Sequence, residues 1–240
     1  MNPIIASVRK ALKAQASEEV RQSSQNFFKE GIVCHGVKSA LVEKIGKQQF
    51  ATVRERSKRE IYALCEELWK GGYIEECMIA CHWSYHVRKQ YESADIKRFE
   101  SWVASYVTNW ATCDTLCNHS VGTLVEMFPE QIESLKKWAQ SKNRWQRRAA
   151  AVALIIPARH GKFLADIFAI ADLLLLDNDD LVQKGYGWML KAASEAHTKE
   201  VHAYVMRHKM VMPRTALRYA IEKMPDALKK SAMIKPATIS

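Results

Sequence analysis

Apolar residues recur every three or four positions along most of the chain, which is the spacing of amphipathic helices and not the alternation of strands. In residues 51–70, Ile61, Leu64 and Leu68 share one helical face, and Gly71 follows as a stop signal. The pattern predicts about twelve helices of roughly ten to eighteen residues, joined by short turns. We therefore expect an all-α fold.

Residues at the expected helix ends support this interpretation. Glycine and proline are few, 9 and 6 in 240 residues, so the turns that an all-β fold needs are missing. Pro129 and Glu130 suit a first helical turn, because proline lacks the unneeded donor and glutamate meets the positive end of the helix dipole. Residues 177–180 are acidic or amide residues that cap the next segment. A cation site in this cluster is the less favoured alternative.

The length of 240 residues fits one large domain or a continuous stack of repeats. We predict a single α-helical repeat domain over residues 1–240, in which residues 232–240 form a loose tail. No strict repeat is visible, but Asp114, Arg148 and Trp188 lie 34 and then 40 residues apart. This matches the scale of about 40 residues in HEAT-type helical pairs, whose equivalent positions line one concave surface.

The composition is that of a folded basic protein. Hydrophobic residues make up 48% of the chain and charged residues 26%, which argues against disorder. The 36 lysines and arginines exceed the 26 acidic residues, and the formal net charge of +10 attracts polyanions. Nucleic acid is therefore the leading partner, although many basic proteins bind no anionic ligand.

The six cysteines and two nearby histidines raise the question of a metal site. Two cysteine pairs lie four residues apart, Cys77 with Cys81 and Cys113 with Cys117. Structural zinc sites usually present tighter Cys-x-x-Cys pairs beside turns, so buried free thiols are favoured over half of a metal site. His82 and His86 share a helical face, but no third ligand is in view, and packing or a DNA-facing surface is the favoured interpretation. We predict no metal and no cofactor.

No targeting or membrane segment is evident. The apolar run in residues 1–15 is too short for the core of a secretory signal. No stretch approaches the roughly 18 uncharged apolar residues of a membrane span, since Arg159, Lys162 and Asp166 interrupt the longest candidate. We expect a cytoplasmic protein with reduced cysteines.

Trp110 and Asp114 are spaced so that an indole and a carboxylate project from one face of a helix. Such a pair suits a cation, because the indole face offers about 0.5 to 2 kcal/mol and the carboxylate adds Coulomb attraction. From this motif alone, a core tryptophan beside a solvated aspartate is the more common arrangement.

Arg144, Arg147 and Arg148 fall on one helical stripe. Three guanidinium groups repel one another unless something negative is present, and phosphate oxygens match the planar fork of arginine. The alternative is a solvated surface patch, but the only nearby acids, Glu130 and Glu133, belong to the preceding helix.

In residues 182–190, Trp188 lies one turn beyond Lys184, and Gly185 and Gly187 sit inside the predicted helix. Each glycine costs up to about 1 kcal/mol relative to alanine. Close approach of another backbone would compensate, and tight packing of a neighbouring helix is favoured over a nucleic acid strand.

Trp110-x-x-x-Asp114, Arg148 in RWQRRAAAVA and Trp188 in QKGYGWML together resemble the DNA alkylation repair glycosylases of the AlkD family, over roughly residues 20–225. The resemblance implies a superhelix of HEAT-like repeats with double-stranded DNA on its concave face. It implies excision of positively charged bases alkylated at N3 or N7, with the lesion left stacked in the duplex, by a monomer.

The resemblance also assigns roles. Asp114 is the catalytic carboxylate, Trp110 and Trp188 are aromatic walls against the sugar and backbone of the lesion, and Arg148 holds a DNA phosphate. We predict further DNA contacts at Arg144, Arg147, Lys184 and Phe27. Phe27 stands where many members have a tyrosine, so a ring is kept and a hydroxyl is lost. Residues 36–47 lack the proline and arginines expected there.

A lone carboxylate is chemically sufficient for this reaction. O-glycosidases usually use two, one of them as an acid that protonates the leaving group. No second carboxylate is evident near Asp114, since the closest acids in sequence are Glu100 and Glu126. A base that is already cationic needs no protonation to depart, so cationic adducts should be released and neutral lesions should not.

Two other functions remain open. The first is a non-catalytic module of the same architecture that binds DNA through its basic face. The second is a helical-repeat scaffold for an acidic protein partner.

Overall fold

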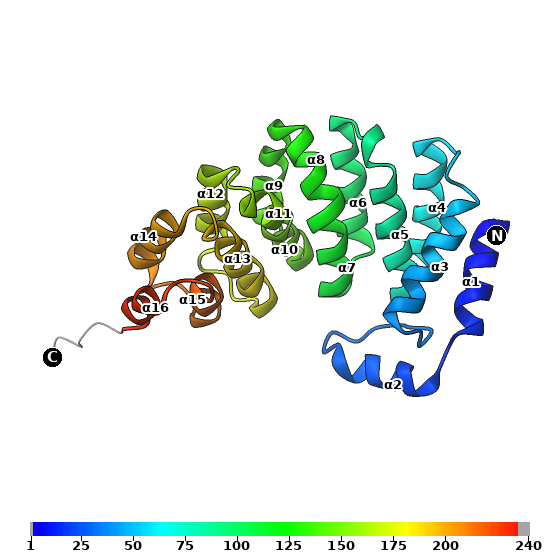
Figure 1. The fold of residues 1–240 in the computed structure, drawn as a ribbon, viewed down its shortest axis with the longest axis horizontal. Coiled ribbons are helices and arrows are strands. Elements are labelled where there is room, and N and C mark those ends of the chain that lie inside the picture. Colours follow the sequence, from blue (N-terminus) through cyan, green and yellow to red (C-terminus); the bar gives the residue numbers. More distant parts are fainter. Residues whose placement is uncertain (1, 235–240) are drawn as a thin grey trace. The chain divides into compact units, whose positions relative to one another are not determined.

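The computed structural model describes residues 2–234, and within them the chain is helical, as predicted (Figure 1). A single isolated bridge between Val33 and Tyr73 is the only β-type pairing in this range. The chain divides into two compact units, residues 1–120 and 121–240, and each is described by itself.

Unit 1, residues 1–120, holds the first seven α-helices. They are α1 Pro3–Ala14, α2 Glu18–Phe27, α3 Ser39–Ala51, α4 Lys58–Gly71, α5 Ile74–His86, α6 Ile96–Ser105 and α7 Trp110–Thr115. Two 3₁₀ turns, Arg88–Gln90 and Ser93–Asp95, precede α6, and a π-helical stretch, Leu116–Val121, follows α7.

Unit 2, residues 121–240, holds the remaining α-helices that the structure describes. They are α8 Gly122–Met127, α9 Ile132–Ala139, α10 Arg144–Val152, α11 Ile155–Arg159, α12 Leu164–Leu174, α13 Asp180–Ala193, α14 Thr198–His208, α15 Arg214–Ile221 and α16 Asp226–Met233. The 3₁₀ turn Pro129–Gln131 leads into α9.

Tryptophans fill the core of unit 1. Trp69, Trp83 and Trp102 are buried, and the Trp83 indole donates to the Gly46 carbonyl at 2.9 Å. These side chains join α4, α5 and α6 to α3. Helix α2 differs because none of its residues is buried, and Figure 1 shows it apart from the α3–α5 stack.

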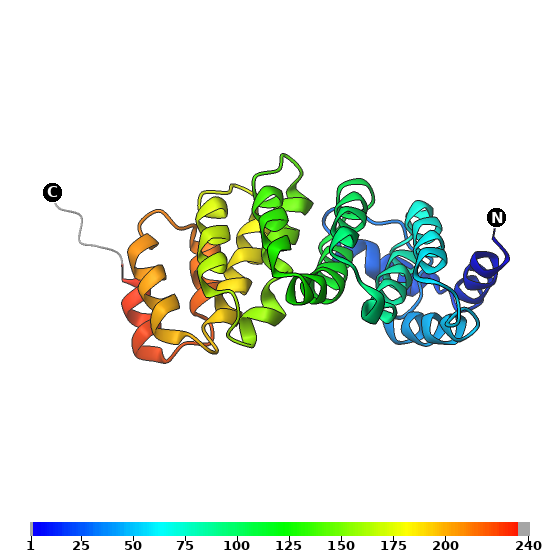
Figure 2. The same ribbon diagram turned by 90° about the horizontal axis from the view of Figure 1, so that it is seen from above.

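Helix α13 is the centre of unit 2 and packs against α10, α11, α12 and α15. Figure 2 shows the helices α12–α16, coloured yellow to red, side by side. At Gly187 a Cβ atom would lie 2.7 Å from the Tyr219 Cβ and 2.8 Å from the Ala216 carbonyl oxygen. The glycine therefore permits close packing of α13 on α15, which confirms the favoured explanation of this residue.

Several helix ends follow the predicted signals. Helix α4 ends at Gly71, and Gly72 adopts a left-handed φ of 73°. Asp179 caps α13, because its Oδ1 accepts from the Leu181 and Val182 backbone amides. Helix α4 begins later than residue 51, at a capping box in which Ser57 and Glu60 bond each other's backbone amides.

The helices are more numerous and shorter than predicted, since some predicted runs are interrupted. The run after residue 144 breaks between α10 and α11, where Pro157 cannot donate to the carbonyl of Ala153. Residues 232 and 233, which were expected in a loose tail, belong to α16, and Ala232 is buried. Residues 235–240 lie outside the described range. No helix of residues 2–234 is long and apolar enough to cross a membrane.

Candidate functional site

Helix α7 carries the predicted carboxylate in unit 1. The Asn109 side chain caps this helix by accepting from the Thr112 amide at 3.0 Å. Asp114 is 8% exposed and Trp110 is half-buried one turn earlier. The helix therefore presents a nearly desolvated carboxylate and an indole along one edge, as the spacing predicted.

Two phenylalanines at the end of α2 surround the Trp110 indole. The Phe28 ring stacks on it with centroids 5.4 Å apart and an interplanar angle of 28°. The Phe27 ring meets it edge-on at 5.9 Å and remains 66% exposed. The structure thus brings Phe27 next to Trp110, and it adds Phe28, which the sequence analysis did not single out.

A buried carboxylate holds the segment that follows these rings. Glu75 on α5 accepts from the backbone amides of His35, Gly36 and Val37, at 2.9, 2.8 and 3.1 Å. Gly36 has a φ of 87°, and its carbonyl accepts from the Ser17 amide beside α2 at 2.9 Å. Residues 35–37 therefore connect α2, and with it the two rings, to α5.

The neighbouring Glu76 is fully buried and joins α5 to α1. It accepts from Arg9 at 2.9 Å and lies 3.0 Å from His35 Nε2. Burial alone would raise the pKa of Glu76, but the hydrogen bonds of His35 and Arg9 outweigh it and the pKa is lowered from 4.5. The carboxylate is therefore ionised at neutral pH and contributes to the cohesion of unit 1.

The cysteines near α7 are buried, whereas His82 is half-buried and His86 is exposed. His86 stacks on Phe50 with ring centroids 4.4 Å apart, and burial lowers the pKa of both His82 and His86. All six cysteines are buried, and none within residues 2–234 forms a disulfide. Burial raises the pKa of the Cys77 thiol to about 12, and no group of three potential metal ligands occurs in the described part of the chain.

Arg148 lies on α10 in unit 2 and is only 5% exposed. Its Nη1 donates to the Leu181 carbonyl at the start of α13. A Cβ atom at Gly185 would lie 3.4 Å from the Arg148 Cγ, so this glycine makes room for the arginine stem. The guanidinium is therefore held in a fixed place between α10 and α13.

The other two arginines have acidic partners within the protein, contrary to the expectation that acids were distant. Arg144 pairs with Asp179 at 2.7 Å, and Arg147 pairs with Asp177 at 2.6 Å. Both carboxylates precede α13, more than 25 residues away in sequence. Tertiary packing thus supplies the negative charge that was attributed to phosphate alone.

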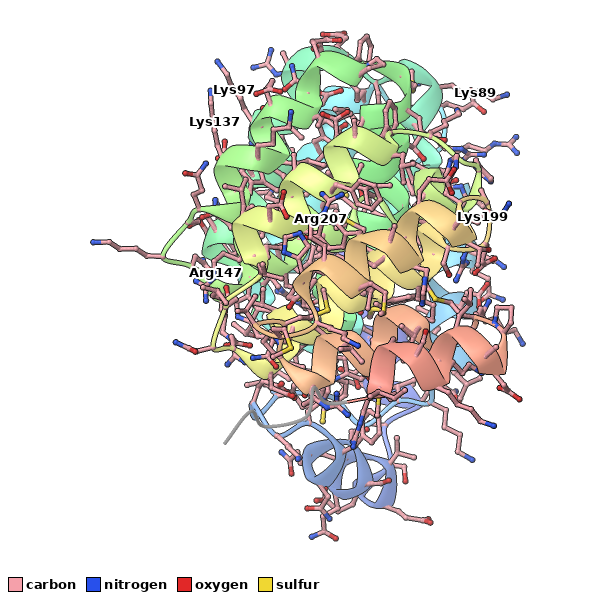
Figure 3. The ribbon with its side chains drawn as sticks, turned by 90° about the vertical axis from the view of Figure 1, so that its left-hand side faces the viewer. Lys89, Lys97, Lys137, Arg147, Lys199 and Arg207 are labelled. Atoms are coloured by element: carbon pink, nitrogen blue, oxygen red, sulfur yellow. The ribbon has the colours of Figure 1, made fainter. Side chains whose placement is uncertain are left out.

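Lys184 and Trp188 occupy one edge of α13. The Lys184 amine lies 2.6 Å from the Asp180 carboxylate, and this hydrogen bond raises the lysine pKa. Trp188 is half-buried one turn later. Figure 3 shows Arg147 and Lys137 along one side of the view and Lys199 along the other, so basic residues of unit 2 are not confined to one face.

The predicted site residues divide between the two units. Unit 1 brings together Phe27, Trp110 and Asp114, and unit 2 holds Arg148, Lys184 and Trp188 on α10 and α13 with Arg144 and Arg147 beside them. Phe28 was not predicted. The only sequence signal for it was its position directly after the predicted Phe27.

Comparisons with known proteins agree with this fold. A family model described as DNA alkylation repair enzyme matches residues 8–224. A solved structure described as a predicted DNA alkylation repair enzyme from Enterococcus faecalis is similar, with a TM-score of 0.80 and 15% sequence identity over 88% of this chain and 98% of that chain. No curated protein sequence matches.

Proposed function

Since this chain belongs to the DNA alkylation repair enzyme family, we propose that it is a DNA glycosylase that excises cationic N3- and N7-alkylated purines. The observation that supports this most is the Trp110–Asp114 edge of α7, with a carboxylate 8% exposed beside a cluster of three aromatic rings. This environment suits a transient cation and no polar neutral ligand.

In the proposed reaction the bond between C1′ and the alkylated base breaks first. Its electron pair leaves with the base and cancels the positive charge there, while the sugar becomes oxocarbenium-like. Asp114 stabilises this sugar cation, and its effect is strengthened by the low exposure of the carboxylate. Asp114 also accepts a proton from the water that attacks C1′.

The aromatic rings orient the damaged nucleotide. Indole faces attract positive charge, by about 0.5 to 2 kcal/mol depending on desolvation. Trp110 is held in place by the Phe28 ring, and Phe27 is free to contact the duplex. The resemblance assigns Trp188 on α13 a contact with the sugar and backbone of the lesion.

Unit 2 supplies the phosphate contacts of the proposal. The resemblance makes Arg148 the principal candidate, and its guanidinium, in a residue 5% exposed, is already oriented by the Leu181 carbonyl. Three further cations would contact phosphates, either by giving up their carboxylate partners or while keeping them. They are Arg144, Arg147 and Lys184. Their contributions to affinity are therefore smaller than those of unpaired cations.

The protein acts on double-stranded DNA as a monomer without a metal or cofactor in this proposal. Buried cysteines with no disulfide in residues 2–234 are compatible with a reducing compartment, and we place the protein in the cytoplasm.

The proposal is tested by release of 7-methylguanine or 3-methyladenine from methylated duplex DNA by the purified chain. Asp114→Asn should lower the single-turnover rate by about 10²- to 10³-fold, because the charge on the stabilising group is lost. Asp226→Asn, which removes an exposed carboxylate from α16, is the matched control and should retain the wild-type rate.

Neutral lesions such as hypoxanthine should not be released. Wild-type protein that binds DNA with steep salt dependence but frees no base would contradict the proposal and indicate a non-catalytic DNA-binding module. Undiminished activity of the Asp114→Asn variant would refute the role of this residue.

A further inference from the structure

Asn118 lies one turn beyond Asp114 in the π-helical stretch Leu116–Val121. The residue is half-buried, and its Oδ1 is buried without a hydrogen-bond partner among residues 2–234. Buried carbonyl-type oxygens are nearly always paired, so the unpaired Asn118 oxygen calls for an explanation, and a bound water is one.

The spacing places Asn118 one helical turn after Asp114. Trp110, Asp114 and Asn118 follow one another at intervals of four residues, which puts them along one edge of the helical segment. The segment changes from α- to π-helix at Leu116, and π-helical turns are frequent at functional sites.

Neighbouring polar side chains already have partners within the protein. The Thr115 hydroxyl donates to the Ala111 carbonyl at 2.8 Å, and Ser120 shares a hydrogen bond of 3.1 Å with Ser84. His119 lies against the Tyr85 ring, with ring centroids 5.3 Å apart. Among these side chains of residues 115–120, the Asn118 oxygen is therefore the acceptor that lacks a partner within the described residues.

We propose that Asn118 Oδ1 positions the attacking water of the glycosylase reaction. This inference rests on the proposed function. The water donates one hydrogen to Asp114 and the other to Asn118, which leaves a lone pair directed at C1′. By then the base has already left with the electron pair of the C–N bond. As the new C1′–O bond forms, the water loses a proton to Asp114. Asn118 remains chemically unchanged.

Two substitutions of Asn118 by residues of similar size distinguish a role in positioning water from a purely structural role. Asn118→Leu removes the acceptor oxygen, and Asn118→Asp keeps one. Gln140→Leu, which removes an exposed carboxamide at the end of α9, is the control. Base release from 7-methylguanine DNA is measured under single turnover, with and without methanol as a competing nucleophile.

The deciding quantity is the share of sugar trapped as the 1′-O-methyl product, measured by mass spectrometry. Asn118→Leu should raise this share several-fold and lower the release rate by about tenfold or more, because water is no longer held in place. Asn118→Asp and Gln140→Leu should keep the wild-type share. Binding of all four proteins to the methylated duplex should agree within about twofold.

If the Asn118→Leu variant gives the same share of 1′-O-methyl product as the wild type, the inference is overturned, even if the release rate falls. A structural defect would slow release without changing how the sugar is divided between water and methanol. If this variant does not give the circular dichroism of the wild type, Asn118→Ala replaces it with the same expected outcomes. Failure of the wild-type chain to release any base is a different result and refutes the proposed function itself.

Discussion

At the scale of single residues, close packing explains why α13 contains glycines, which weaken a helix. Gly185 and Gly187 interrupt a helix that other residues would stabilise, yet one accommodates the stem of Arg148 and the other the backbone of α15. At Gly187 the cost of glycine in a helix, up to about 1 kcal/mol, is offset by packing that leaves no room for a Cβ atom.

We expect Gly187→Ala to destabilise the protein by about 1 to 3 kcal/mol, because the added methyl group would lie within 3 Å of both Tyr219 Cβ and the Ala216 oxygen. Gly185→Ala is the comparison, since the added methyl group would lie 3.4 Å from its nearest neighbour, which is an ordinary van der Waals contact. Urea denaturation measures both. A Gly187→Ala variant as stable as the wild type would show that α13 and α15 can separate without cost.

At the scale of elements, two adjacent glutamates of α5 organise the helices around the candidate carboxylate. Glu75 binds the backbone of residues 35–37 and so holds the start of α2, while Glu76 joins α1 and His35. Since no residue of α2 is buried, the position of this helix depends on such polar contacts more than on apolar packing.

Because of Glu76, the stability of unit 1 should depend on pH in the acid range. The pKa of Glu76 in the folded state lies below 4.5. Its contribution to the free energy of unfolding is therefore fully present at pH values above the pKa of the unfolded state. This contribution is lost as the pH falls through the lower pKa of the folded state. Glu76→Gln should lower stability at pH 7 and reduce the loss of stability between neutral pH and about pH 3.

Denaturation at a series of pH values measures this effect. Glu43→Gln is the control, because the pKa of Glu43 is also lowered, by its hydrogen bond with Lys47, but this pair is exposed and screened by solvent. Equal pH profiles for the two variants would contradict the assigned role of Glu76.

At the scale of the whole molecule, the count of 36 lysines and arginines overstates the number of unpaired cations that can meet a polyanion. Arg144, Arg147 and Lys184 each have a carboxylate within 3 Å. Binding to a polyanion therefore has to compete with internal pairs, and a measured salt slope reports how many of these cations reach phosphates.

Replacing Lys184 by glutamine should weaken duplex binding uniformly across sequences and reduce the slope of log K against log salt by about one. Lys199→Gln, on the exposed start of α14, should leave the slope unchanged. Fluorescence anisotropy between about 50 and 200 mM salt measures both. An unchanged slope for Lys184→Gln would place this residue outside the DNA contact.

Much of the fold could be predicted because its signals are local. The Asp179 cap, the Gly71 stop and the Trp110–Asp114 pair each depend on residues a few positions apart in one helix. The breaks in helices were harder to predict, since the π-helical stretch after Thr115 has no local signal comparable to Pro157.

The sequence by itself determined the helical content, the family and the residues that share the edge of α7, because helix periodicity and motif spacing are properties of neighbouring positions. Tertiary structure alone decided that Phe28 stacks on Trp110, that Asp177 and Asp179 neutralise two arginines, and that Gly187 faces α15. These contacts join residues roughly 30 or more positions apart, so their existence depends on how helices pack and not on the pattern within any one of them.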